Sequence, residues 1–404
     1  MNPALLTTIT VLQIVAFAVL LLPTIYILVF AFAGLFYRQK AYPSNASLKR
    51  IAVLIPGYKE DEVIIEVAKD ALAQDYPQGY YDVVIIADSF QPETLAMLRE
   101  MPIKVIEVKF EKSTKSKALN KAMEQLEGPY DIAVVLDADN LMAEDFLTKI
   151  NSAFERNFMA VQGHRAAKNM DTALAILDAA SEEINNHIFR KGHRVLGLSS
   201  AIIGSGMAFR YNFFKNMMQG VTAVGGFDKE IELHMLKHRH KIDYLDDAVV
   251  YDEKVQKDEV FSNQRRRWLS AQLHYFRQDF LSSLLALFTK GNIDYFDKAI
   301  QFIQPPRILL LGAVTLSSAF FIFLNILWKF PVMPVLAWLI LWSACILAFL
   351  FSVPRSFYNT QTLTALASLP KGMLLMLGSL LKIKGANKQF IHTKHSAVKA
   401  PPKA

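Results

Sequence analysis

The sequence contains one cysteine, Cys345, in 404 residues, so it offers no disulfide framework and no cysteine-based metal site. A lone cysteine suits a reducing compartment. The sequence also has neither a G-x-G-x-x-G nor a G-x-x-x-x-G-K-[ST] segment, which argues against a Rossmann dinucleotide site and against a P-loop. It shows no internal repeat and no long low-complexity segment.

Charged residues are missing from three long stretches, residues 1–37, 308–328 and 331–354. Because roughly 20 apolar residues cross a bilayer core as a helix, each stretch predicts a transmembrane helix. No basic segment precedes the first stretch, so we interpret it as a retained helix and not as a cleaved signal peptide. Only Lys329 and Phe330 separate the last two, which predicts a tight hairpin. A pair of buried core helices is the alternative.

Lysine and arginine flank these stretches unevenly. The positive-inside tendency places the N-terminus outside, and the central region and the C-terminus in the cytoplasm. The sequence therefore predicts a multi-pass protein of the cell inner (cytoplasmic) membrane. The formal net charge of +7 suits a domain that works against anionic headgroups or anionic substrates. The basic residues on the predicted cytoplasmic side of the stretches are Arg38, Lys40, Lys49, Arg50, Arg307, Arg355 and Lys371.

The central region alternates apolar, β-branched runs with helical patterns. Such alternation predicts βαβ units, a mainly parallel sheet and hence an α/β fold. Ligands of such sheets bind outside the carboxyl ends of the strands, where this sequence places Tyr58, Glu60, Asp88, Asp137 and Asp139. The expected strands are residues 50–58, 81–89, 103–110 and 130–140, and the expected helices lie near residues 60–74, 92–100 and 116–126.

Asp137 and Asp139 follow the fourth expected strand in "VVLDADN". Alternation along an extended chain aims both side chains to one side, where two carboxylates repel each other unless a cation lies between them. A hard divalent ion, Mg²⁺ or Mn²⁺, shared with a diphosphate would meet that need. A solvated loop with two acids is the alternative.

Seven segments stand along the chain in the order "VLIPGYKE", "VVIIADS", "KSKALNKAM", "VVLDADN", "GSGMAFR", "GGFDKEIELHML" and "QRRRW". This order resembles that of family 2 glycosyltransferases, and most of all the membrane-embedded branch that contains cellulose, chitin, hyaluronan and poly-N-acetylglucosamine synthases. The resemblance covers roughly residues 50 to 270. It implies a GT-A (Rossmann-like) fold and inverting transfer of a sugar from a nucleotide donor, most often a UDP-sugar.

The resemblance also implies a donor site. Asp88 matches the acid that holds the uracil or ribose, and Lys115 and Asn120 match the Lys and Asn near the diphosphate. Asp139 matches the metal ligand, for Mg²⁺ or Mn²⁺, and Asp137 the group on the ribose side of the nucleotide. With the strand-end residues, the expected donor-binding set is Tyr58, Glu60, Asp88, Lys115, Asn120, Asp137, Gln264 and Arg267.

The family's Gln-x-x-Arg-Trp segment is matched by Gln264, Arg267 and Trp268. The Arg meets the diphosphate, a bidentate contact that guanidinium groups make well, and the Trp lies at the acceptor end. From this sequence a packing role suits Trp268 as well as a stacking role on a sugar. Arg265 and Arg266 fill the variable places of an amphipathic stretch, and we expect membrane headgroups beside them. The expected acceptor-binding set is Gly204, Ser205, Gly206 and Trp268.

A general base must accept the proton of the acceptor hydroxyl. In the family it is the Asp of a Thr-Glu-Asp or Glu-Asp pair, which this sequence replaces with "FDKEIEL". Glu230 is the first choice for the catalytic base if "EIEL" aligns with the usual "DxEL", and Asp228 is the second. Glu232 is expected only to cap or solvate the helix.

These features predict a metal-dependent, nucleotide-sugar-dependent hexosyltransferase that extends a polysaccharide processively at the inner membrane. Its partners would be a nucleotide-sugar donor, a glycan or lipid-linked acceptor, the bilayer and polysaccharide export proteins, but no nucleic acid. Three spans are few for an enzyme that exports its own product. Non-processive transfer of one sugar to a lipid-linked acceptor is therefore the alternative, and an inactive membrane-anchored scaffold is a third.

The same interpretation divides the chain into five parts. They are an N-terminal transmembrane helix (residues 1–40), a cytoplasmic GT-A domain (41–275), interfacial amphipathic helices (276–306), a transmembrane hairpin (307–354), and an interfacial helix with a basic cytoplasmic tail (355–404).

Overall fold

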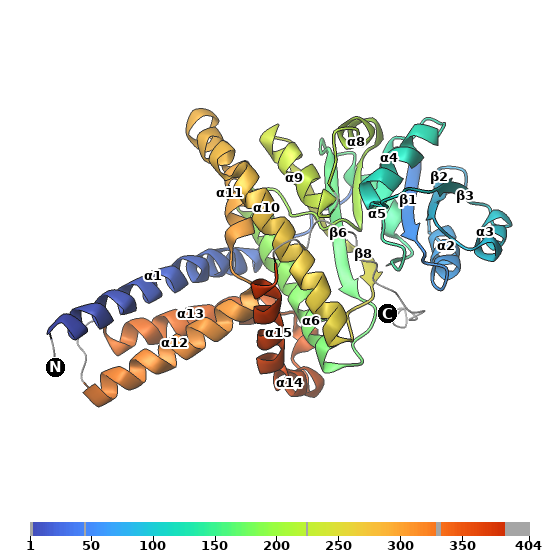
Figure 1. The fold of residues 1–404 in the computed structure, drawn as a ribbon. Coiled ribbons are helices and arrows are strands. Elements are labelled where there is room, and N and C mark those ends of the chain that lie inside the picture. The colour runs from blue at the N-terminus through green and yellow to red at the C-terminus, as the bar shows by residue number, and fades with distance from the viewer. Residues whose placement is uncertain (1–2, 44–45, 224, 329–332, 384–404) are drawn as a thin grey trace.

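The structure, a computed structural model, describes residues 3–43, 46–223, 225–328 and 333–383. An α/β unit stands on one side of the molecule, and a bundle of long apolar helices extends away from it on the other (Figure 1). The expected hairpin loop at Lys329 and Phe330, and the basic tail beyond residue 383, lie outside the described residues.

In the described part of the chain, eight strands form one mixed sheet in the order β3-β2-β1-β4-β7-β6-β8-β5. The first four in this order run parallel, β7 is antiparallel to both of its neighbours, β8 is parallel to β6, and β5 is antiparallel to β8. The strands are β1 (Ile51–Tyr58), β2 (Tyr81–Asp88), β3 (Lys104–Val108), β4 (Ile132–Val135), β5 (Leu141–Met142), β6 (Ala160–Ala167), β7 (Met207–Arg210) and β8 (Ile242–Asp252).

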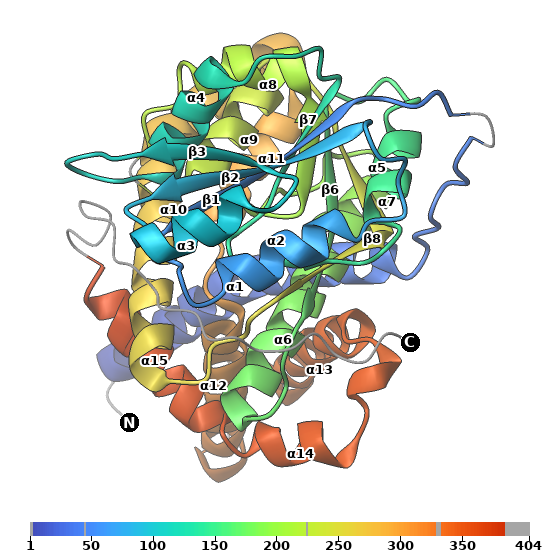
Figure 2. The ribbon, with the colours of Figure 1, turned by 90° about the vertical axis from the view of Figure 1, so that its right-hand side faces the viewer.

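Helices cover both faces of this sheet (Figure 2). Alternate residues of β1 enter different cores: Ala52 and Leu54 pack on one face, and Ile51, Val53 and Ile55 on the other. Burial on both faces explains why the strand sequence is a continuous apolar run. One face carries α2 (Ile64–Leu72), α3 (Pro92–Arg99) and α5 (Phe146–Ala153), and the other carries α4 (Lys115–Gln125), α8 (Tyr211–Met218) and α9 (Phe227–Lys237).

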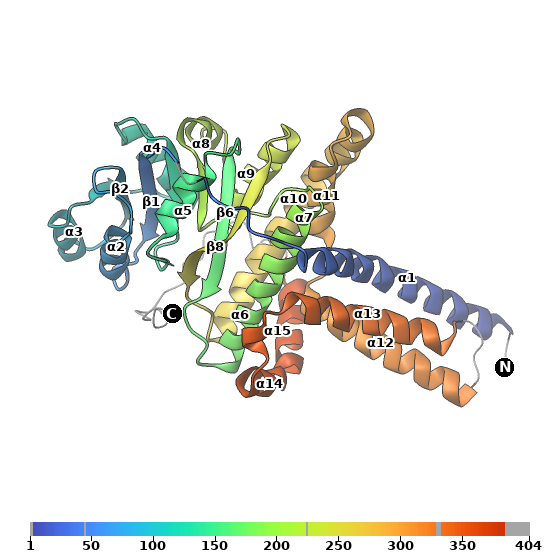
Figure 3. The same cartoon turned by 180° about the vertical axis from the view of Figure 1, so that it is seen from behind.

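Three of the described helices are long and apolar enough to cross a membrane: α1 (Pro3–Gly34), α12 (Arg307–Trp328) and α13 (Val335–Ser352). They run side by side away from the sheet (Figures 1 and 3). These helices coincide with the three uncharged stretches of the sequence. The 3-10 helix η2 (Arg355–Phe357) follows, and then α14 (Thr360–Leu366) and α15 (Leu369–Leu381). α14 and α15 meet at an angle of 51°, and they are long and apolar enough to cross a membrane only if the two count as one bent span.

Further helices lie between the sheet and this bundle (Figure 1). α6 (Ala173–Asn185) continues into the π-helix η1 (Asn186–Gly192) and the short α7 (His193–Val195), while α10 (Asp258–Lys290) turns back into α11 (Ile293–Ile303). α14 packs on α6, and α15 on α10. The η1 backbone touches α1 so closely that a Cβ on Gly192 would lie 2.1 Å from the Phe30 carbonyl oxygen. The α/β unit is therefore joined tightly to the first apolar helix.

The expected α/β fold is confirmed, and the four predicted strands and three predicted helices are all present. The α2 helix begins at Ile64, later than the predicted residue 60. α10 runs without a break through residue 275, where the sequence suggested a boundary. The five-part division of the chain stays a prediction.

Candidate active site

A cavity of about 290 Å³ opens at the carboxyl ends of the parallel strands. Strand register explains how distant residues meet there: Tyr58 ends β1 directly beside Asp88, which ends β2. The loop after β4, the neighbour of β1 on its other side, supplies the two aspartates. The residues of the expected site that line this first cavity are Tyr58, Glu60, Asp88, Lys115, Asp137, Asp139, Gln264, Arg267 and Trp268.

The two aspartates of the loop after β4 have different surroundings. Lys115 Nζ lies 2.5 Å from Asp137 Oδ1 and donates a hydrogen bond to the Gly204 carbonyl at 2.7 Å. Asp139 is 5% exposed, and its Oδ2 accepts a hydrogen bond from the Glu253 amide at 3.1 Å. Asp139 is thus held rigidly, whereas the Asp137 side chain is 40% exposed and reaches into the cavity.

The aspartate pair suits Mg²⁺ or Mn²⁺. Carboxylate oxygens are the ligands that these hard cations prefer, and Mg²⁺ commonly takes one or two carboxylates, with waters and substrate phosphates as the other ligands. The described residues contain no group of three or more His, Cys, Asp or Glu side chains arranged around one point. A metal here would therefore be held by Asp137 and Asp139 together with the phosphates of a bound nucleotide.

Helix α10 brings three further site residues to the same place. Gln264, Arg267 and Trp268 are three and four residues apart, so they share one face of the helix, and all three line the first cavity. Burial lowers the pKa of the Arg267 guanidinium, which nevertheless stays charged at any physiological pH. The Trp268 side chain is 36% exposed, so it is not a fully buried packing residue.

The prediction that Arg265 faces membrane headgroups is wrong. Its guanidinium forms an ion pair with Asp178 of α6, and both side chains are largely buried. It also lies over the rings of Phe261 and Trp268, with its Cζ 4.8 Å and 4.4 Å from the two centroids. Arg265 therefore fastens α10 to α6 and supports Trp268. The expectation for Arg266 stays a prediction.

A second cavity of about 340 Å³ adjoins the first. The two share lining residues, among them Lys115, Asp137, Arg165, Arg267 and Trp268. The second cavity extends from this border toward η1, the beginning of α9, α10 and α11. It receives Gly204 and Asp228 of the expected site.

The two candidate bases point in different directions. Asp228 lines the second cavity, with one carboxylate oxygen 3.5 Å from Lys229 Nζ. Glu230 lies outside the lining of both cavities, and its carboxylate accepts hydrogen bonds from the backbone amides of Thr222 and Ala223 at 3.4 and 3.0 Å. The geometry thus favours the residue that the sequence ranked second.

Three other expected residues lie behind the cavities. Asn120 donates a hydrogen bond to the Met218 carbonyl at 2.9 Å. Ser205 is fully buried, and its hydroxyl accepts a hydrogen bond from the Asp137 amide at 2.9 Å. Gly206 adopts φ +61°, and its carbonyl accepts from the Gly163 amide at 2.7 Å. These residues shape the loops of the site, and their substrate contacts stay predictions.

The expectation that Glu232 only caps or solvates its helix is wrong. Its side chain is 2% exposed and lines the second cavity, where it forms an ion pair of 2.7 Å with Lys298 of α11. Lys298 lies outside every motif considered in the sequence. The pair connects α9, which carries Asp228, to α11.

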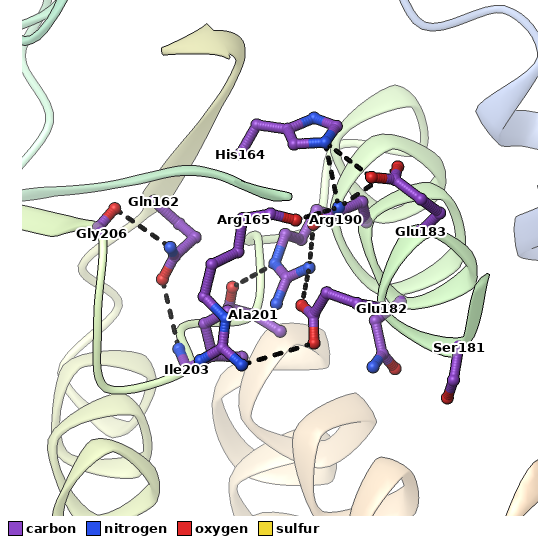
Figure 4. Close-up of polar contacts among 12 residues, drawn as sticks. Gln162, His164, Arg165, Ser181, Glu182, Glu183, Arg190, Ala201, Ile203 and Gly206 are labelled. Carbon is purple, nitrogen blue, oxygen red and sulfur yellow. Dashed lines mark hydrogen bonds and ion pairs between the residues drawn. The ribbon is translucent and has the colours of Figure 1, made fainter. Parts of the chain in front are cut away.

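A buried network of charges, which no sequence motif indicated, lies beside the cavities (Figure 4). Arg165 of β6 lines both cavities and lies 2.8 Å from Asp252 and 3.7 Å from Glu182. Glu182 in turn lies 3.3 Å from Arg190 of η1. The strong positive charge of Arg165 beside Asp137 and Asp139 offsets their repulsion. Arg165 could not be found from the sequence, because it lies in a segment without a known motif.

His164, next to this network, should make the stability of the fold depend on pH. Burial alone lowers the pKa of His164, but hydrogen bonds of 3.0 Å to Asp246 and 3.0 Å to Glu183 outweigh it and raise the pKa from 6.5 to about 9. The protonated form thus stabilises the fold fully below about pH 6.5, and this contribution is lost as the pH rises through about 9.

The measurement is thermal unfolding of the full chain in detergent between pH 6 and pH 9.5. We expect the Tm of the wild type to fall over the upper part of this range, and His164→Gln to flatten that fall. An unchanged difference between the two proteins at all pH values would contradict the assignment.

Comparisons with known proteins show the family and the fold of the chain. The family model described as "Glycosyltransferase like family 2" matches residues 49–271. Beta-monoglucosyldiacylglycerol synthases from Nostoc sp. and Synechocystis sp. are 27% and 24% identical over 59% and 56% of this chain. The matches cover 52% and 48% of those proteins, so the chain spans about half the length of the curated relatives it matches.

A solved structure shares the fold. Mannosyltransferase PcManGT from Pyrobaculum calidifontis, in complex with GDP-Man and Mn²⁺, aligns with a TM-score of 0.58 at 17% sequence identity. The alignment covers 93% of this chain and 98% of that one, so the similarity includes the helices outside the sheet.

Proposed function

The chain belongs to glycosyltransferase-like family 2, and from this premise we propose that it transfers one sugar from a nucleotide sugar to a lipid acceptor at the inner membrane. The observation that carries the proposal is the second cavity. It adjoins the first cavity, where the strand ends and the aspartate pair suit a nucleotide diphosphate, and it extends to helices that contact the apolar bundle. A lipid acceptor can reach such a cavity from the bilayer.

Single addition is supported better than the processive polymerisation that the Gln-x-x-Arg-Trp segment suggested. The curated relatives carry names of enzymes that add one glucose to diacylglycerol, and not of polymer synthases. The three long apolar helices of the described chain also offer little material for a polysaccharide channel. Single transfer needs only a membrane anchor and a site at the surface.

The chemistry is one displacement. The acceptor hydroxyl oxygen forms a bond to the anomeric carbon while the bond from that carbon to the diphosphate breaks, so the configuration inverts. Asp228 takes the hydroxyl proton, and the nucleoside diphosphate leaves with the electron pair. Negative charge grows on the departing oxygen, where Arg267 and Lys115 supply fixed positive charge. Asp88 and Tyr58 line the first cavity at the ends of β2 and β1, where they suit the nucleoside.

A divalent cation held by Asp137 and Asp139 would neutralise part of the diphosphate charge. We therefore expect protein treated with EDTA and dialysed to lose sugar transfer, and Mg²⁺ or Mn²⁺ to restore it. Asp139→Asn should raise the metal concentration needed for half-maximal rate by at least about tenfold, because one of two ligand carboxylates is lost. Asp75→Asn is the matched control, because Asp75 is exposed and lies outside the lining of both cavities. Full activity in EDTA would contradict metal dependence.

Product analysis tests the proposed function. The full chain would be reconstituted in phosphatidylcholine vesicles with a lipid extract and one radiolabelled donor at a time: UDP-glucose, UDP-N-acetylglucosamine, UDP-glucuronate or GDP-mannose. A single labelled glycolipid, extractable into organic solvent, is the expected product. A ladder of water-soluble chains would contradict single addition and support processive polymerisation instead.

A further inference from the structure

The second cavity lies between the proposed donor site and the apolar bundle. Its far wall consists of Phe189 and Arg190 of η1 and of Lys298, Gln301 and Phe302 of α11. Both elements connect to apolar helices. η1 packs on α1, where His187 Nε2 lies 2.8 Å from the Ala31 carbonyl, and α11 leads within a few residues into α12. This wall of the cavity is thus built from elements that adjoin the apolar helices.

Cations in this cavity are already neutralised by carboxylates. Arg190 lies 3.3 Å from Glu182, and Lys298 lies 2.7 Å from Glu232, with all four side chains at most 9% exposed. Lys229 lies 3.5 Å from Asp228. A phosphate group here would have to displace these carboxylates or lie beside them, and a buried charge without its own partner is costly.

The cations at the border of the two cavities are committed elsewhere. Lys115 pairs with Asp137, and Arg165 with Asp252, at 2.5 and 2.8 Å. Arg267, at the same border, faces the place of the donor diphosphate in the proposed mechanism. An anionic acceptor therefore meets carboxylates in the second cavity without a cation reserved for it.

The remaining groups of the wall suit hydroxyl groups. Carboxylates accept hydrogen bonds from hydroxyls, and the side-chain amide of Gln272 can donate or accept. The amides of Asn185 and Gln301 also line the cavity and already bond Arg307, Lys298 and Asp297. Phe189, Phe302 and Trp268 supply apolar area beside them. A mixture of a few polar groups with aromatic walls is typical of sites for small polar molecules.

We infer that the second cavity binds the uncharged, hydroxyl-bearing headgroup of a lipid, such as a glycerol or sugar headgroup, and excludes lipids whose headgroup carries a phosphate. The inference rests on the proposed function and adds the class of acceptor. Asp228 at the edge of the cavity is placed to take the proton of the hydroxyl that reacts.

Three matched lipids test the inference. The full chain would be reconstituted in phosphatidylcholine vesicles that contain dioleoylglycerol, dioleoylphosphatidylglycerol or dioleoylphosphatidate, with the nucleotide sugar that gives a labelled glycolipid in the product analysis. The acyl chains are identical. Dioleoylglycerol has one hydroxyl, phosphatidylglycerol has two hydroxyls and one phosphate, and phosphatidate has a phosphate and no alcohol hydroxyl. We expect transfer to dioleoylglycerol to be at least about tenfold faster than to phosphatidylglycerol, because specificity is the difference between two binding free energies. Phosphatidate, which has no alcohol to glycosylate, serves as a competitor and should not slow transfer to dioleoylglycerol.

The outcomes separate this inference from the proposed function. Faster transfer to phosphatidylglycerol, or inhibition by phosphatidate, would overturn the inference and leave lipid glycosylation intact. Transfer to soluble glycan primers, with none to any of the lipids, would overturn both.

A charge change in the wall should shift the preference. Glu232→Gln leaves the Lys298 ammonium without its carboxylate, so we expect the rate with phosphatidylglycerol relative to dioleoylglycerol to rise by about tenfold. Glu124→Gln, on the exposed surface of α4, is the matched control and should leave the ratio unchanged. Donor binding by calorimetry shows whether each variant is folded.

A second variant covers the case in which Glu232→Gln does not fold. Lys298→Gln removes the cation and keeps the carboxylate, so the ratio should fall below that of the wild type. The same ratio in all folded variants would overturn the role of the second cavity as the headgroup site.

Discussion

Asp228→Asn is expected to lower kcat for sugar transfer by about 10²- to 10⁴-fold, the usual contribution of a general base. The amide keeps the shape of the side chain and cannot accept the proton of the acceptor hydroxyl. Because Asp228 lines the second cavity and not the first, binding of the nucleotide sugar should stay within about twofold. Initial rates at saturating donor and acceptor give kcat, and calorimetry gives the donor Kd.

Glu230→Gln distinguishes the two candidates for the base. The Glu230 carboxylate accepts hydrogen bonds from two backbone amides of the preceding loop, and a glutamine oxygen can keep at least one of them. We expect a lower Tm and a kcat reduced by less than about tenfold. The lost hydrogen bond holds the loop in place, whereas the transfer of the acceptor proton does not involve Glu230. A larger loss of kcat in Glu230→Gln than in Asp228→Asn would restore the order that the sequence suggested.

The fold could be predicted from the sequence where local pattern and tertiary structure agree. The strands β1, β2 and β4 are buried on both faces, so their apolar runs are continuous and their ends are marked by polar residues. Parallel pairing then brings Tyr58 and Asp88 side by side, as the sequence analysis expected of strand ends. The aspartate pair could be predicted for the same reason, because it follows the end of a parallel strand.

Side-chain direction on helices could not be predicted in the same way. Asp228 and Glu230 are two residues apart, which turns their side chains by about 200° around α9, so one faces the cavity and the other the preceding loop. Arg265 and Arg267 differ likewise on α10, with Asp178 on one side and the cavities on the other. Which face meets the site depends on how the helix packs, and that information lies outside the motif.

The charged walls of the second cavity were invisible for a related reason. Lys298 meets Glu232 across α9 and α11, and Arg165 meets Glu182 across β6 and α6. Each residue taken alone suits a solvated surface. Only a partner of opposite charge from another element offsets the desolvation penalty of its burial. The proposed acceptor side of the site therefore depends on tertiary packing, whereas the proposed donor side consists largely of residues at strand ends.

Arg267→Met is expected to lower kcat by about 10²- to 10³-fold, the range seen when one preorganised donor to a developing negative charge is removed. Arg267 lines both cavities, at the border where the diphosphate departs in the proposed mechanism. Methionine keeps the length of the apolar stem and removes the charge. Arg267→Lys should recover part of the loss, since it restores a charge without the bidentate geometry of a guanidinium.

Arg266→Met is the matched control, because Arg266 is adjacent on α10 and lies outside the lining of both cavities. We expect its kcat to stay within about twofold of the wild type, as substitutions away from a site usually have small effects. The rates would be measured in vesicles of phosphatidylcholine and again with added anionic phosphatidylglycerol. If both variants lose activity equally, and only in anionic vesicles, the basic segment acts on the membrane surface. A loss confined to Arg267→Met, independent of vesicle charge, places that one guanidinium on the leaving diphosphate.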